Sequence, residues 1–90
     1  SLMGNIKHMM TYEIKIRNTK GTKISIDVLD QIPISNNKDY VVELIDKGGA
    51  EYLEKYGKLS WKMDLAPNES KTIRFQYSVK HPKNLTLQGL

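Results

Sequence analysis

Apolar and polar side chains alternate along most of this chain with a period of two residues. The alternation recurs in five stretches, at 12–17, 23–28, 40–45, 58–65 and 72–80. Because successive side chains of a strand point to opposite faces, this pattern predicts half-buried antiparallel strands. In the stretch 40–45 both alternating sets are largely apolar, so we expect burial on both faces over part of its length. The segments 4–10 and 85–90 are candidates for additional short edge strands.

The residues between these stretches are typical of turns. Asn18-Thr19-Lys20-Gly21 predicts a hairpin turn in which Gly21 takes a positive φ. Ala66-Pro67-Asn68-Glu69 places Pro67 at the second position of a type I turn. The longer connection 48–57 is rich in glycine at its two ends and has room for one helical turn between them.

Short strands with turn signals every ~8–12 residues favour an all-β, immunoglobulin-like antiparallel β-sandwich of about 5–7 strands. Trp61 lies in the middle of a predicted strand, and we expect it in the core. The alternative is an OB-like barrel, or a sandwich, that binds glycan or single-stranded nucleic acid. A nucleic-acid binder places aromatic side chains among its lysines and arginines. Tyr12 and Tyr77 instead share the aliphatic side of their strands, so we expect both to be buried.

Ninety residues predict a single domain at 1–90, with a leader or edge strand at 1–9, a core at 10–84 and a C-terminal tail at 85–90. We expect it to be excised from a larger protein.

Acidic residues interleave with the lysines, so the net charge of +4 indicates a solvated mixed surface rather than a nucleic-acid interface. No apolar run approaches the roughly 20 residues of a membrane span, and no signal peptide is visible.

Residues suited to catalysis or metal binding are sparse. The chain has no cysteine, which excludes disulfides, thiolate metal sites and a cysteine nucleophile. Its two histidines, His8 and His81, are expected at opposite ends of the domain, too few and too far apart for a catalytic base or a zinc site. Asp27 and Asp30 are interpreted as surface charge rather than a hydrolytic carboxylate pair. We therefore expect no enzyme activity, no metal and no cofactor.

The segment Asp30–Ser35, with the sequence DQIPIS, interrupts the alternation directly after a predicted strand. Pro33 has no N–H and cannot continue a central strand, so an extended crossover from one sheet to the other is expected. The side chains of Asp30 and Ser35 are suited to binding nearby backbone groups. If the segment also serves as an interaction site, its candidate residues are Asp30, Gln31, Pro33 and Ser35.

A wider pattern surrounds this crossover. It consists of a strand ending at Asn18, the DQIPIS segment, Gly57-x-Leu59-x-Trp61, Leu65-Ala66-Pro67 and Tyr77-x-Val79-x-x-Pro82. In this combination the chain resembles the C-terminal region of the mucoidy inhibitor A family, also catalogued as the bacterial domain of unknown function DUF4139, over about residues 10–84. The sequence departs from the family pattern at Asn68, where members often have glycine.

The resemblance implies a non-enzymatic structural or interaction module of a bacterial envelope-associated protein, located in the periplasm, the cell envelope or outside the cell. It also implies a link to exopolysaccharide production, the mucoidy phenotype. Expected partners are other proteins or other domains of the parent chain, with glycan left open and no specific nucleic acid. An exposed strand edge, for which 6–10 is the suspect, leaves a homo-oligomer open as well.

Overall fold

The computed structural model describes residues 4–90 and contains six antiparallel strands in two sheets. No α-helix occurs within this range, which confirms an all-β fold consistent with a β-sandwich. The elements are β1 (Asn5–Arg17), β2 (Ile24–Gln31), β3 (Val41–Asp46), β4 (Glu51–Leu53), β5 (Lys58–Leu65), β6 (Ser70–Pro82) and a short 3-10 turn (Leu87–Gly89). In the described part of the chain no helix is long and apolar enough to span a membrane.

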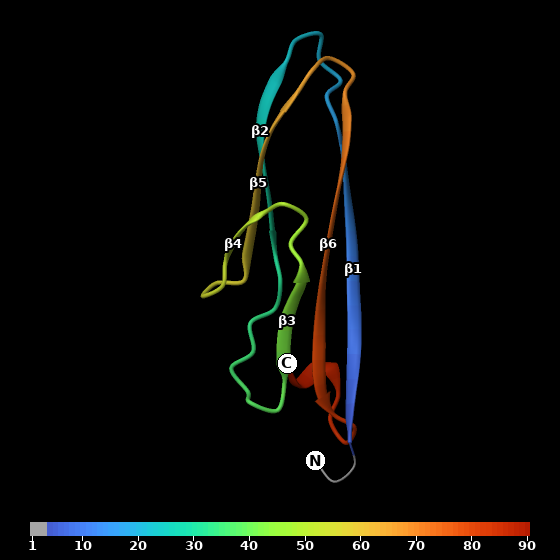
Figure 1. Cartoon of the computed structure of the whole chain (residues 1–90), viewed down its shortest axis with the longest axis vertical. Helices are drawn as coiled ribbons and strands as arrows, with labels where there is room; N and C mark the ends of the chain where they lie inside the picture. Colours follow the sequence, from blue (N-terminus) through green and yellow to red (C-terminus); the bar gives the residue numbers. More distant parts are fainter. Residues whose placement is uncertain (1–3) are drawn as a thin grey trace.

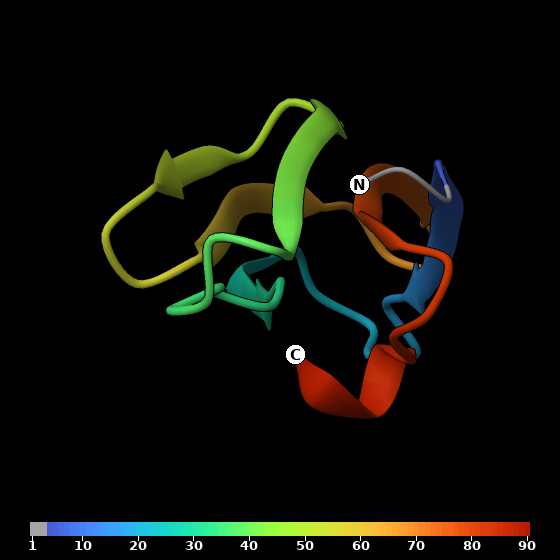
Figure 2. The same cartoon turned by 90° about the horizontal axis from the view of Figure 1, so that it is seen from below.

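The two sheets have the strand orders β1-β6-β3 and β2-β5-β4. β1 and β6 are 13 residues each, pair without a register shift, and run along the long axis of a domain that measures 59 × 20 × 18 Å (Figure 1). Seen from the end in Figure 2, β2, β5 and β4 lie on one side of the domain, and β1 and β6 lie on the other. This arrangement leaves two separate sheets rather than one closed barrel, so the OB-like alternative is wrong as a description of the fold.

The core lies between the inward faces of the long strands. Trp61 of β5 packs at a tilt against Phe75 of β6, with ring centroids 5.8 Å apart, and its indole Nε1 donates a hydrogen bond to the Gly48 carbonyl oxygen at 2.8 Å. The prediction that Trp61 is a core residue is confirmed. The buried apolar cluster comprises Ile32, Tyr40, Ala50, Leu59, Trp61, Ile73, Phe75, Tyr77 and Val79.

Asn18 connects the sheets at one end of the domain. The predicted hairpin at 18–21 is wrong, because β1 and β2 lie in different sheets and the segment crosses between them. The Asn18 side chain is 1% exposed, and its amide nitrogen lies within 3.1 Å of three carbonyl oxygens. Gly21 does not have a positive φ. The left-handed conformation nearby belongs instead to Asn68, whose φ of 63° fits a type II turn after Pro67 rather than the predicted type I.

Three further expectations need correction. The segment 50–56 forms strand β4 and a turn instead of a helical turn, because Glu51–Leu53 pairs with β5. β3 is not buried on both faces, since Val41 and Ile45 are exposed at the edge of their sheet. The segment 85–90 contains the 3-10 turn rather than a strand, while 5–10 simply continues β1.

Candidate functional site

The DQIPIS segment leaves β2 in one sheet and leads to β3 in the other, as predicted. Ile32 is fully buried, and its backbone N–H donates to the Gly57 carbonyl oxygen at 2.8 Å. Gly57 has a φ of 65°, and a Cβ at this position would lie 2.4 Å from the Ile32 carbonyl oxygen. The crossover is therefore fixed by one buried side chain and by a backbone contact that only glycine permits.

The four candidate residues do not form one cluster. Asp30 and Gln31 are the last residues of β2, and both are exposed. The Asp30 carboxylate accepts the N–H of Gln31 at 2.7 Å, while the Gln31 side-chain amide donates to the Tyr56 carbonyl oxygen at 3.2 Å. Ser35 instead donates to the Asn37 carbonyl oxygen at 2.7 Å and thus shapes the loop before β3. Pro33, between Gln31 and Ser35 in the chain, is half-buried.

The charge of Asp30 also influences Tyr77 of the opposite sheet. Burial raises the pKa of Tyr77 to about 12, with smaller contributions from the adjacent Tyr12 hydroxyl and from the negative charge of Asp30. Tyr77 is buried as expected, but Tyr12 is 46% exposed, so the expectation that both are buried is wrong for Tyr12. The reason is its place on the edge strand β1, where it stacks on Tyr77 with one flank uncovered.

A shallow depression of about 500 Å³ lies beside Asp30 and Gln31 on the β2-β5-β4 sheet. We call it the Leu29 depression; it is lined by Leu29, Asp30, Gln31, Leu53, Lys58, Leu59 and Ser60. Two of its apolar side chains face solvent, with Leu29 74% and Leu53 58% exposed. The depression thus combines exposed leucines with a carboxylate, an amide and an ammonium group.

The strand pairing explains why these side chains gather. Leu29 is opposite Ser60 across the β2–β5 ladder, and Leu53 is opposite Lys58 across the β4–β5 ladder. The exposed Tyr56 follows in the next turn, with the ammonium groups of Lys55 and Lys58 within 5.7 Å of its ring centre. Sequence reasoning missed Leu29, although its position out of phase with the alternation of β2 was a usable signal.

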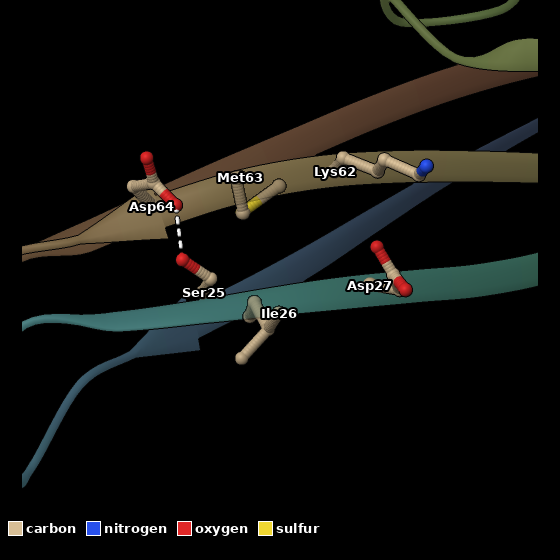
Figure 3. A pocket seen from close by; sticks show the side chains of 6 residues that line it. All are labelled: Ser25, Ile26, Asp27, Lys62, Met63 and Asp64. Atoms are coloured by element: carbon tan, nitrogen blue, oxygen red, sulfur yellow. Dashed lines mark hydrogen bonds between the residues drawn. The ribbon is translucent and has the colours of Figure 1, made fainter.

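A second depression on the same sheet is dominated by charge (Figure 3). Ser25, Asp27, Lys62 and Asp64 line it together with Ile26 and Met63, and Asp27 is directly opposite Lys62. The Ser25 hydroxyl donates to the Asp64 carboxylate, which holds the pKa of Asp64 below its usual value with help from the positive charge of Lys23. Asp27 therefore faces a cation and not Asp30, in agreement with its interpretation as surface charge.

The two histidines are in contact, contrary to the expectation that they lie at opposite ends. Antiparallel pairing of β1 with β6 brings His8 and His81 together, with their Nε2 atoms 2.9 Å apart and their rings stacked. His81 is 2% exposed, and its Nδ1 lies 2.7 Å from the Pro82 carbonyl oxygen. Among the described residues no group of three or more His, Cys, Asp or Glu side chains is arranged to hold a metal ion.

Comparisons with known proteins place this chain by its sequence. A search of curated proteins and a search of solved structures found no significant match. The family described as "Domain of unknown function (DUF4139)" matches residues 2–83, which include all six strands, the DQIPIS crossover and every residue that lines the Leu29 depression. Since this match spans most of the 90 residues, the chain belongs to the DUF4139 family.

Proposed function

We propose that this domain is a non-enzymatic interaction module that binds a protein partner through the Leu29 depression. The observation that carries the proposal is the exposure of Leu29 and Leu53, at 74% and 58%, on either side of a concave surface. Exposed apolar side chains rimmed by polar groups are typical of protein interaction sites. Asp30, Gln31 and Lys58 supply that polar rim.

The surroundings of the depression support a preformed surface. Gly57 and Ile32 join the crossover to the β4–β5 turn, and Gln31 donates to the backbone of Tyr56 in the same turn. A surface held by such backbone contacts loses little conformational entropy on binding. As part of this proposal, the parent protein is a bacterial envelope protein linked to exopolysaccharide production; this part rests on the resemblance to the mucoidy inhibitor A family.

Site-specific photo-cross-linking in the parent bacterium tests the proposal. A photoreactive amino acid replaces Leu29 in the full-length protein, and the matched control replaces Val41, which is 48% exposed on the other sheet. We expect one defined protein, or one other segment of the parent chain, to cross-link at position 29 and not at 41. The cross-linked species is then purified and titrated against this domain by calorimetry.

The titration compares the unmodified domain with Leu29→Ser and Val41→Ser. Loss of a central apolar contact at an interface costs about 1–2 kcal/mol, so Leu29→Ser weakens binding about tenfold while Val41→Ser leaves it unchanged. Equal cross-linking at both positions contradicts the proposal. Amide shifts around Leu29 with bacterial polysaccharide fragments, in the absence of any protein partner, support the glycan-binding alternative instead.

A further inference from the structure

The free edge of β1 is the most regular unpaired strand edge in the described part of the chain. β1 pairs with β6 on one side only, over 13 residues without a bulge or a proline. The other edge strands are less suited to pairing: β3 has a register shift between Leu44 and Asp46, β4 has three residues and β2 has eight. A long edge without a bulge or a proline is a template for another strand.

We propose that two copies of this chain associate through antiparallel pairing of their β1 strands, with Met10 opposite Met10 on a two-fold axis. The pairing joins two three-stranded sheets into one six-stranded sheet. This surface is distinct from the Leu29 depression, which lies on the other sheet, so the proposal does not depend on the proposed function.

Geometry limits the registers that two β1 strands can adopt. Along an edge strand only every second residue directs its N–H and C=O outward. In a symmetric antiparallel pair, each outward-directed residue must lie opposite another outward-directed residue, so the two residue numbers are both odd or both even. The two-fold axis then passes between two copies of the same residue and not between two peptide bonds. The registers that keep most of the strand paired are those centred on residues 9, 10, 11, 12 and 13 of β1.

Charge selects one of these registers. Centring on Met10 places Lys7 opposite Glu13 of the second copy, twice by symmetry. Centring on Thr11 or on Tyr12 places Lys7 opposite Lys15 or Arg17, and centring on Glu13 pairs that carboxylate with itself. Centring on Met9 forms no opposite-charge pair.

The neighbouring strand strengthens this choice. Within one copy Lys7 is opposite Lys80 of β6, an unfavourable like-charge pair. Glu13 is opposite Arg74, which lies 4.0 Å from Asp46 in an ion pair. Placing Glu13 of the second copy on the open side of Lys7 gives that lysine the anionic neighbour that its own sheet does not provide.

The same register also covers apolar side chains at the edge. It places Ile6 opposite Ile14 and His8 opposite Tyr12 on the inward face, on either side of the Met10 pair. Tyr12 is 46% exposed although its ring stacks on Phe75 at 5.3 Å, and the uncovered flank lies on the edge strand. A second β1 strand alongside removes this flank from water.

Cysteine cross-linking tests the register, because the chain contains no native cysteine. Directly opposite residues of an antiparallel pair have the Cα separation that a disulfide requires, whereas diagonal residues do not. We expect Met10→Cys to form a disulfide-linked dimer on mild oxidation much faster than Met9→Cys. Met9 is 49% exposed, so random collisions between molecules would favour disulfide formation by the control variant Met9→Cys. Faster cross-linking by Met10→Cys therefore cannot result from exposure.

Charge reversal tests the pairing without a covalent link. Sedimentation velocity over a wide concentration range gives the association of the unmodified chain and of three variants. Lys7→Glu is expected to weaken association about tenfold, although it relieves the repulsion from Lys80 and leaves the monomer at least as stable. Glu13→Lys weakens association likewise, and the double variant restores it. A strictly monomeric chain, faster cross-linking at Met9, or no recovery in the double variant overturns the proposal.

Discussion

The Gly57 backbone and the Ile32 carbonyl are so close that a Cβ on Gly57 would lie 2.4 Å from that oxygen. In return, the Gly57 carbonyl accepts the Ile32 N–H at 2.8 Å. This contact joins the crossover between the sheets to the turn before β5, two segments 25 residues apart. It therefore fixes the chain next to Gln31 and Lys58, two residues that line the Leu29 depression.

Gly57→Ala is predicted to be strongly destabilising. The substitution places a side chain on a residue with a φ of 65°, and its Cβ clashes with the Ile32 carbonyl oxygen. We therefore expect the free energy of unfolding to fall by about 2–4 kcal/mol. Urea denaturation measures the change. Gly49→Ala is the matched control, because Gly49 has a φ of 80° but no atom within 4 Å of its Cβ position, and backbone strain alone costs about 1 kcal/mol. Equal losses for the two variants contradict the role of the contact.

Asn18→Ala is predicted to cost about 2–4 kcal/mol of unfolding free energy, since it leaves several buried groups without partners. The Asn18 amide nitrogen donates to the Leu65 carbonyl oxygen at 3.0 Å and the side-chain oxygen accepts the Lys20 N–H at 2.9 Å. Thermal and urea unfolding give the value. Asn37→Ala is the control, because Asn37 makes a similar turn contact but is exposed. A loss no larger than that of the control argues against Asn18 as the joint between the sheets.

The strands were largely predictable from the sequence because each buries one face. The alternation at 58–65 coincides with β5, and that at 72–80 lies within β6. The turns were predicted less well. A turn such as 18–21 has the same residue types whether the following strand pairs with the preceding strand or crosses to the other sheet. Only long-range packing decides between these two outcomes.

The candidate site was predictable only in part. Pro33 and the end of alternation marked the crossover, but nothing local indicated that β4 would lie next to it and bring Leu53 toward Leu29. The contact between His8 and His81 likewise depends on the pairing of the first and last strands, 73 residues apart in sequence. Such juxtapositions are set by sheet order, which the periodicity of single strands does not encode.

Tyr77 is predicted to ionise well above the ordinary pKa of a tyrosine. Its pKa of about 12 in the folded protein lies above the ordinary value of 10.0, so the folded chain keeps a proton that the unfolded chain releases. The stability that Tyr77 contributes is therefore complete below pH 10 and is lost as the pH rises toward 12. Phenolate absorbance should show a late component that Tyr77→Phe removes, and this variant should lose less stability over the same interval. A titration with all tyrosines near pH 10 contradicts the assignment.

When His8 and His81 are both neutral, their hydrogen-bond partners determine which ring nitrogen of each histidine carries the proton. The Pro82 carbonyl oxygen only accepts hydrogen bonds, so His81 Nδ1, at 2.7 Å, must carry a proton. His81 Nε2 is then an acceptor, and His8 must donate from its own Nε2 across 2.9 Å. Long-range nitrogen–proton NMR correlations of the imidazole rings should identify the Nδ1–H tautomer for His81 and the Nε2–H tautomer for His8. In His8→Phe the His81 pattern should persist, because the Pro82 contact remains, while His81 Nε2 loses its donor and the domain unfolds at lower urea. An Nε2–H tautomer at His81 in the unmodified chain would show that the two rings are not paired in this way.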